Sequence, residues 1–434
     1  MTCFYLLEFP RLTTGANVSQ VTELTLEGGN IISISNNSLP PGLISLDLFR
    51  HPFTNISDDA FDSSLATLRS LSIVGAKFTS LPAALKKLTS LTRLVIDDTR
   101  IQFWDTVLLN HLADTVEHLQ LSNMGLSKWP SWISDFRLLH TLDLSSNPLK
   151  SIPKDALNFI KDLLTFLSLK GTGLTYIPQA LMVLSNLTTL DLSSNNITDV
   201  SEVENLVKSA FSQTLSVLHL DSTGLTRMPN LSNLTRLHSL TFTHNKISDV
   251  PAGSLPLSLT SLYLSFNGIK SVPKDISSMT GLSYLDLSGN LLTYIEPNSF
   301  PSSLTDLHLS FTNLTTITNT TFSNLNLLRI LDLSYNYFST FPHAAFTDLV
   351  SLIYLYLSDC NLTEFPLAFT ALNPQTDIFW TMVHDPACPC PAAQELIQWS
   401  ASLKHPSYME GRCSNGQSIA SYLSGQCGQQ PVAP

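Results

Sequence analysis

Apolar and polar positions follow a fixed order in LRILDLSYNYFSTFP, residues 328–342. Leu328, Leu331 and Leu333 are apolar, and Asn336 stands at the ninth place counted from Leu328. The second and third of these leucines are two residues apart, which is the period at which strand side chains point to one face. The pattern therefore predicts a short strand that buries its leucines and turns the residues between them outward.

The same arrangement recurs fifteen times. The copies begin at Val21, Leu43, Leu68, Leu91, Val116, Leu139, Leu164, Leu187, Leu215, Leu237, Leu259, Leu282, Leu304, Leu328 and Leu352. Successive starts are 22 residues apart at the shortest (21 to 43) and 28 at the longest (187 to 215). A repeat of this length buries its apolar face only by stacking on its neighbours, so a chain of 434 residues need not split into separate globular domains. We expect each strand to pair in parallel with the next, and the rest of each repeat to form the crossover.

A polar residue recurs at the ninth place of the later repeats. It is Asn147, Asn195, Asn245, Asn267, Asn290 or Asn336 in six repeats, Thr172, Thr223 or Thr312 in three, and Cys360 in the last. The turn after each strand leaves backbone groups that the sheet does not pair, and an unpaired buried polar group costs about 1–3 kcal/mol. An amide offers two donors and an acceptor. We therefore expect this row to bond the backbone of adjacent turns rather than to form a binding site, with Cys360 free and buried.

The segment that returns from one strand to the next has two recurring features. A proline often opens it: Pro82, Pro130, Pro153, Pro178, Pro229, Pro251, Pro273, Pro342 and Pro366. Because proline fixes φ and lacks an N–H, we expect an extended start followed by short helical turns. Phe61, Phe322 and Phe346 recur shortly before a strand and predict a stacked aromatic layer of the core. The longest step predicts an enlarged loop near SEVENLVKSAF.

These repeats resemble the leucine-rich-repeat superfamily over about residues 21 to 372, and AFTDLVSLIYLYLSDCNLTEFP is similar to the repeats of extracellular receptors and matrix proteins. The resemblance implies an α/β fold, a right-handed leucine-rich-repeat solenoid of about 15 repeats, curved like a horseshoe with its parallel β-sheet on the concave face. It also implies a binding module, because family members rarely do chemistry with the repeats themselves. We expect one unbroken solenoid from about Val21 to Leu372.

Four of the six cysteines follow the last repeat: Cys388, Cys390, Cys413 and Cys427. Their order, with Trp380 before them and Trp399 in an apolar helical stretch, is similar to the cysteine-rich cap of secreted leucine-rich-repeat proteins. The pairing in that family implies the disulfides Cys388–Cys413 and Cys390–Cys427 in a small C-terminal cap. From the residues alone three connectivities are open. A zinc site near His384 is a rival interpretation, but the C-x-x-C pairs usual in structural zinc sites are absent.

The two ends of the chain indicate a fragment. Cys3 stands alone before the first repeat, where extracellular family members carry a cysteine cap, and no signal-peptide pattern precedes it. We expect residues 1–20 to be the remnant of an N-terminal capping region, 21–373 the solenoid, 374–427 the cysteine-rich cap, and 428–434 a polar tail or the start of a stalk.

Ten N-x-S/T sequons predict N-glycosylation in a secreted protein. They are Asn17, Asn36, Asn55, Asn186, Asn196, Asn230, Asn233, Asn313, Asn319 and Asn361. Three of them, Asn196, Asn313 and Asn361, directly follow the ninth-place row, where a side chain can face solvent.

Composition and motif searches narrow the function. A net charge of −11 and a pI near 5.4 argue against a nucleic-acid partner, which usually needs a basic stripe. No apolar run reaches the 18 residues of a membrane span. Gly171-Thr172-Gly173 lacks the third glycine of a dinucleotide loop, and no P-loop, kinase signature or H-E-x-x-H occurs. We predict no enzyme activity, cofactor or metal site.

Aromatic and acidic residues gather at the outward positions of the last five repeats. We predict that they bind a ligand on the concave face: Tyr263, Phe266, Tyr284, Asp286, His308, Phe311, Asp332, Tyr335, Tyr354 and Tyr356. Exposed aromatic rings are common anchors of interfaces, and rings beside carboxylates suit a basic or amphipathic segment. In the alternative interpretation the aspartates follow the repeat consensus and the rings pack along the sheet.

Three function classes follow from these observations. The first is a recognition ectodomain, secreted or membrane-anchored, that binds a protein, peptide or glycan; a receptor kinase whose span and kinase lie beyond Pro434 is one version. The second is an intracellular scaffold with reduced cysteines and unused sequons, and hence a cytoplasmic protein. The third is an enzyme. The cysteine cap and the sequons favour the first class, an extracellular or cell-surface protein.

Overall fold

The structure is a computed structural model, and it describes residues 2–6, 20–36, 38–380, 385–403 and 411–426. The chain divides into two compact units, residues 1–219 (unit 1) and 220–434 (unit 2). Each unit is built of stacked repeats and is described by itself.

Unit 1 contains one parallel sheet in which each strand pairs with the strand of the neighbouring repeat. Its strands are β1 (Thr2–Leu6), β2 (Glu23–Gly29), β4 (Ser45–Phe49), β6 (Ser70–Val74), β7 (Arg93–Asp97), β8 (His118–Gln120), β9 (Thr141–Asp143), β10 (Phe166–Ser168), β11 (Thr189–Asp191) and β12 (Val217–His219). A second, two-stranded parallel sheet joins β3 (Ser33–Ile34) to β5 (Asn55–Ile56). The register pairs equivalent positions of neighbouring repeats. Leu142, for example, pairs with Leu119 and with Leu167, so the buried leucines form a continuous column.

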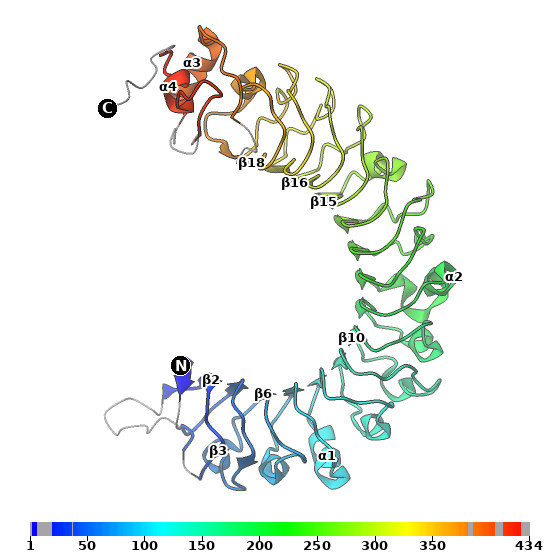
Figure 1. The fold of residues 1–434 in the computed structure, drawn as a ribbon. Coiled ribbons are helices and arrows are strands. Elements are labelled where there is room, and N and C mark those ends of the chain that lie inside the picture. The colour runs from blue at the N-terminus through cyan, green and yellow to red at the C-terminus, as the bar shows by residue number, and fades with distance from the viewer. Residues whose placement is uncertain (1, 7–19, 37, 381–384, 404–410, 427–434) are drawn as a thin grey trace. The chain divides into compact units, whose positions relative to one another are not determined.

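The return segments of unit 1 are mostly short helical turns. They are η2 (Asp62–Ser64), η3 (Ala83–Lys87), α1 (Thr106–Ala113), η4 (Ser131–Asp135), η5 (Asn158–Ile160), η6 (Gln179–Val183), α2 (Val200–Glu204), η7 (Asn205–Lys208) and η8 (Ala210–Gln213). Pro82, Pro130 and Pro178 each directly precede a 3-10 helix, as predicted. Figure 1 shows α1 and α2 on the side of unit 1 opposite its strands. The predicted enlarged loop contains α2, η7 and η8.

Helix α1 is longer than the helical turns that the prolines predict. Asp105 caps it, because its carboxylate accepts hydrogen bonds from the backbone N–H groups of Val107 and Leu108. Such a cap satisfies donors that have no partner within a helix. Leu108 and Leu112 bury the inner side of the helix.

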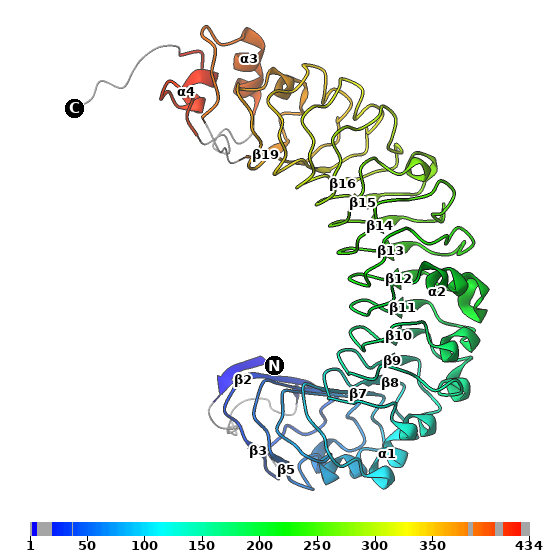
Figure 2. The same ribbon diagram turned by 45° about the vertical axis from the view of Figure 1, so that its right-hand side comes forward.

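Unit 2 continues the same construction. Its parallel strands are β13 (Ser239–Thr241), β14 (Ser261–Tyr263), β15 (Tyr284–Asp286), β16 (Asp306–His308), β17 (Ile330–Asp332), β18 (Tyr354–Tyr356) and β19 (Asp377–Phe379). In Figure 2, β13 to β16 lie side by side in the order of the chain. The helices are η9 (Lys274–Ser278), η10 (Leu367–Ala371), α3 (Gln394–Ser402) and α4 (Ile419–Leu423).

All fifteen predicted strands form, and the sheets extend beyond them at both ends. β1 pairs with β2 and lies within the expected capping remnant. β19 pairs with β18 and lies within the expected cap, so the strand ladder does not stop at the last predicted repeat. The leucine spacing does not reach these two strands, so the repeat pattern did not predict them. The bounds of the four predicted regions stay predictions.

The ninth-place row bonds the turn backbone as predicted. In unit 2, Asn336 Nδ2 donates to the carbonyl oxygens of Leu309 and Leu333 at 2.8 and 2.9 Å. Its Oδ1 accepts from Thr312 Oγ1 and from the backbone N–H of Leu314 at 2.7 and 3.2 Å. Asn147, Asn195, Asn245, Asn267 and Asn290 make equivalent bonds. The row is therefore part of the core.

The aromatic layer is also present. In unit 2 the rings of Phe322 and Phe346 stack with centroids 6.4 Å apart, and Phe346 contacts Phe369 at 6.5 Å. In unit 1 Phe61 is fully buried. Cys360 is free and buried, and its thiol donates to the carbonyl oxygen of Leu333 at 3.3 Å.

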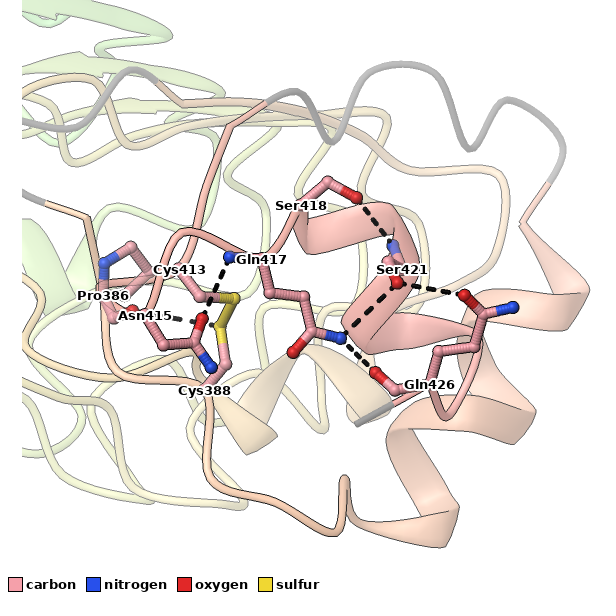
Figure 3. Close-up of a disulfide and its surroundings, with 8 residues drawn as sticks. All are labelled: Pro386, Cys388, Cys413, Asn415, Gln417, Ser418, Ser421 and Gln426. Atoms are coloured by element: carbon pink, nitrogen blue, oxygen red, sulfur yellow. Dashed lines mark hydrogen bonds between the residues drawn. A yellow bond between two sulfur atoms is a disulfide. The ribbon is translucent and has the colours of Figure 1, made fainter. Parts of the chain in front are cut away.

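The C-terminal part of unit 2 contains the implied disulfide Cys388–Cys413, whose Cα atoms are 5.7 Å apart. Figure 3 shows that Gln417 and helix α4 lie beside it. The backbone of Cys413 bonds the carbonyl oxygen of Gln417, and the Trp399 indole donates to that of Leu372 at 3.3 Å, which ties α3 to the last repeat. Cys390 is also disulfide-bonded. Its predicted partner Cys427 lies outside the described residues, as does His384, so that pairing stays a prediction.

Candidate ligand-binding face

Seven of the ten predicted ligand residues lie on the outward face of the unit 2 strands. We call them the strand-face set: Tyr263, Tyr284, Asp286, His308, Asp332, Tyr354 and Tyr356. The strand leucines between them are buried, whereas these side chains are half-buried or exposed. The alternation of the β period places them there, because Leu262, Leu285 and Leu331 occupy the core side.

The rings of the strand-face set touch across strands. Tyr263 and Tyr284 are 4.7 Å apart between ring centroids, and Tyr284 and His308 are 5.2 Å apart. Further along the sheet, Tyr354 and Tyr356 are 6.4 Å apart. The structure therefore joins five of the seven residues into two aromatic groups, with Asp286 and Asp332 in the same sheet.

Phe379 belongs to the second group and is not among the residues predicted from the sequence. Its ring stacks on Tyr356 at 4.9 Å and lies 6.0 Å from Tyr354. It sits on β19, which has no leucine at the predicted spacing. The alternation of Asp377, Ile378 and Phe379 with a buried Ile378 is the signal that could have found it.

Burial raises the pKa of three tyrosines on this face. Burial, with the nearby charges of Asp286 and Asp306, raises the pKa of Tyr284 to about 12. The pKa values of Tyr263 and Tyr356 are also raised mainly by burial. At neutral pH these side chains are therefore neutral phenols, and each combines an apolar ring with a hydrogen-bonding hydroxyl.

The two aspartates have a structural role as well. Asp286 Oδ1 accepts a hydrogen bond from the backbone N–H of Ser288 at 2.9 Å, and Asp332 Oδ1 accepts one from Ser334 at 3.0 Å. In unit 1, Asp143 makes the same bond to Ser145 at 2.8 Å. This part of the alternative interpretation is correct: these aspartates serve the turn of the repeat. Their charge still lies on the strand face.

The remaining three predicted residues, Phe266, Phe311 and Tyr335, lie in the turns after the strands. They form a separate row, because each follows the end of its strand and has a positive φ of 52° to 58°. Phe311 stacks on Tyr335 with centroids 4.0 Å apart, and Phe266 stacks on His244 at 4.5 Å. The pKa of Tyr335 is raised mainly by its hydrogen bond to Asp359. Sequence spacing alone did not separate this turn row from the strand-face set.

The strand face of unit 2 carries negative charge. Asp286, Asp306, Asp332 and Asp377 occupy outward strand positions there, and no lysine or arginine occupies one in β13 to β19. His308 is the one basic side chain at the outward positions of β13 to β19. The face therefore combines aromatic rings with carboxylates and favours positively charged groups.

Nothing among the described residues points to metal chemistry or to a membrane span. No group of three or more His, Cys, Asp or Glu side chains in this part of the chain is arranged to hold a metal ion. Within the same residues, no helix has the length and the apolar character needed to cross a bilayer.

A protein-family model described as Leucine rich repeat matches residues 137–197, 258–301 and 302–362. The chain has a leucine-rich-repeat fold. No curated protein matches it in a sequence search.

Solved structures share this leucine-rich-repeat fold. The mouse RP105/MD-1 complex matches with a TM-score of 0.67 and 19% identity over 100% of this chain and 78% of that chain. The Drosophila Toll–Spatzle complex matches with a TM-score of 0.63 and 20% identity over 84% of this chain and 51% of that chain, so the chain spans about half of the Toll structure's length. A TLR13–ssRNA13 complex matches with a TM-score of 0.59 and 19% identity over 88% of this chain and 70% of that chain.

The predicted glycosylation sites are accessible where the structure describes them. Asn36, Asn55, Asn186, Asn196, Asn230, Asn233, Asn313, Asn319 and Asn361 are all exposed. Asn17 lies outside the described residues. Exposure is necessary for modification, so these sites stay predictions.

Proposed function

We propose that this chain is a non-enzymatic recognition module that binds a protein or peptide on the strand face of unit 2. The observation that carries the proposal is the pair of aromatic groups on that face, Tyr263–Tyr284–His308 and Tyr354–Tyr356–Phe379. Aromatic rings held on a rigid sheet lose little conformational freedom on binding, so they suit the centre of an interface.

The ligand should carry positive charge. Four aspartates share this face with the rings, and a lysine or arginine side chain gains from both, through charge attraction and through contact with the ring faces. Phe266, Phe311 and Tyr335 border the same face from the turns.

A nucleic-acid ligand is less well supported, although a protein of the same fold is described in a complex with ssRNA. Phosphates need basic partners, and the outward positions of the described unit 2 strands hold carboxylates instead. A glycan remains compatible with aromatic rings, but rings flanked by acids favour a cationic ligand.

We also propose that the module is extracellular or at the cell surface, as the ectodomain of a secreted or membrane-anchored receptor. A disulfide in the C-terminal part and nine exposed sequons support this location, because disulfides persist in oxidising compartments. The Toll and RP105 structures, described as complexes with Spatzle and MD-1, are consistent with partner binding on this fold. The alternative is an intracellular scaffold, for which reduced cysteines would be required.

Selection of binding peptides tests the proposal. Short random peptides displayed on phage are selected against the oxidised chain, and the winners are synthesised and titrated by calorimetry. We expect winners with net positive charge and at least one lysine or arginine. An acidic peptide of matched length and single-stranded polyuridine serve as probes of the rival ligand classes.

The expected result is binding of the basic winners that weakens as salt rises, because surface charges are screened. Winners without basic residues, or preferential binding of polyuridine, would overturn the ligand class. Winners that bind equally well to a chain with an altered strand face would overturn the site.

A further inference from the structure

An exposed apolar flank lies beside one predicted glycosylation site of unit 2. Counted from the start of each repeat, Leu291, Asn313, Tyr337 and Asn361 all stand at the tenth place of four successive repeats. Leu291 is 45% exposed and Tyr337 61% exposed, and Asn313 between them is exposed as well. Contiguous exposed apolar surface often marks an interaction site.

Backbone hydrogen bonds bring these repeats side by side at this flank. The N–H of Asn313 donates to the carbonyl oxygen of Leu292 at 2.8 Å, and that of Tyr337 donates to Leu314 at 2.8 Å. Chains paired in this way run about 4.8 Å apart. The side chain of Asn313 therefore stands between those of Leu291 and Tyr337.

The turn row contributes two rings from positions close to this asparagine in the repeat. Phe311 precedes Asn313 by two residues and is 51% exposed, and Tyr335 stacks on it from the next repeat with an interplanar angle of 8°. Phe311 and Tyr335 both have a left-handed backbone, which is uncommon for a bulky residue. Tyr335 is 44% exposed, so both stacked rings reach the surface.

We propose that an N-linked glycan on Asn313 packs its first N-acetylglucosamine on an apolar platform formed by Leu291 and the rings of Phe311, Tyr335 and Tyr337. The C–H bonds on one face of a sugar ring carry partial positive charge, and the face of an aromatic ring is electron-rich, so the two attract each other. The glycan removes this apolar surface from water. The inference rests on the extracellular location proposed above.

The chain itself supplies a matched site that lacks the platform. Asn196 occupies the same tenth place in unit 1 and is equally exposed. Its neighbour one repeat earlier is Gly173, and the residue two places before it is Ser194. A glycan on Asn196 therefore meets no ring at the positions that correspond to Leu291 and Phe311.

The test uses the chain secreted from cultured animal cells, with its glycans trimmed enzymatically to single N-acetylglucosamines. Thr315→Ala removes the Asn313 sequon and Thr198→Ala removes that of Asn196. Each is made with and without Tyr337→Ala, an exposed position whose truncation leaves the core untouched. Thermal unfolding measures stability, hydroxyl-radical footprinting measures the exposure of Tyr337, and peptide mass mapping measures occupancy.

We expect Thr315→Ala to lower the melting temperature by roughly 1–3 °C in the parent and to have a smaller effect beside Tyr337→Ala. We also expect it to raise the labelling of Tyr337. Thr198→Ala should do neither. An unoccupied Asn313, or equal effects at Asn196 and Asn313, would overturn the proposal. If none of the sequons were occupied, both the platform and the proposed extracellular location would be wrong. If the sequons were occupied but the effect of Thr315→Ala did not depend on Tyr337, only the platform would be wrong.

Discussion

The side-chain Nδ2 of Asn147 donates a hydrogen bond to the carbonyl oxygen of Leu121, 26 residues earlier in the chain, at 2.7 Å. The Oδ1 atom of the same amide accepts from the backbone N–H groups of Met124 and Leu126, at 3.0 and 3.1 Å. One side chain thus satisfies three backbone groups of the preceding repeat. The ninth-place row is for this reason a source of stability rather than a binding site.

Replacement of this amide should destabilise the fold. Asn147→Ala leaves buried donors and acceptors without partners, and we expect a loss of about 1–3 kcal/mol in the free energy of unfolding. Urea denaturation followed by circular dichroism measures it. Asn158→Ala is the control, because Asn158 is exposed and its amide bonds only Asp155, at 3.2 Å, among the described contacts. Equal effects of the two substitutions would contradict the structural role.

Substitution in the aromatic layer of unit 2 should lower the free energy of unfolding more than Asn147→Ala does. Phe346 is fully buried and contacts Phe322, Phe341 and Phe369. We expect Phe346→Ala to cost about 3–5 kcal/mol, because it leaves a cavity in the core. Phe103→Ala, at an exposed ring in unit 1, should change stability by less than about 0.5 kcal/mol in the same assay. A small loss at Phe346 would mean that the layer is not packed as described.

Acid should weaken unit 1 through His51. This residue takes the ninth place of its repeat, is fully buried, and accepts a hydrogen bond at Nδ1 from the Ile31 N–H at 3.4 Å. Burial lowers its pKa below the ordinary value of about 6.5. Since the unfolded chain binds the proton more readily, the contribution of His51 to stability is present above about pH 6.5 and falls as the pH drops below it.

Urea denaturation at about pH 7.5 and about pH 5.5 checks this prediction. His51→Asn keeps a polar group at the ninth place but cannot titrate, so it should reduce the difference between the two pH values. An unchanged difference would assign the acid sensitivity to other groups.

The ionisation of Tyr284 reports on the strand face. Its pKa is raised to about 12 by burial and by neighbouring carboxylates, so it should stay protonated when exposed tyrosines ionise near pH 10. The ultraviolet absorbance change on titration to about pH 11 should therefore be nearly the same in the parent and in Tyr284→Phe. Loss of one full tyrosine equivalent in the variant would show that Tyr284 is open to water.

The sequence could predict the repeats because their spacing is imposed by burial: Leu285 and Leu331 recur where a strand must face the core. It also predicted the amide row, since a buried amide such as Asn336 has few other uses. The leucine spacing did not locate β19, whose Ile378 replaces a leucine, and it did not separate Phe311 and Tyr335 from the strand face. That separation depends on the left-handed backbone of the turn, which side-chain spacing does not encode.

The most direct test of the central claim is the affinity of a selected basic peptide for strand-face variants. Tyr263→Ala with Tyr356→Ala removes one ring from each aromatic group, and neither residue is part of the core. Phe166→Ala removes a ring from the strand face of unit 1 and serves as the matched control. Calorimetric titration should show a loss of at least about tenfold for the tyrosine variant, the effect of losing interface anchors, and no change for the control. Unchanged affinity in a folded tyrosine variant would contradict the claim that the strand face of unit 2 binds the ligand.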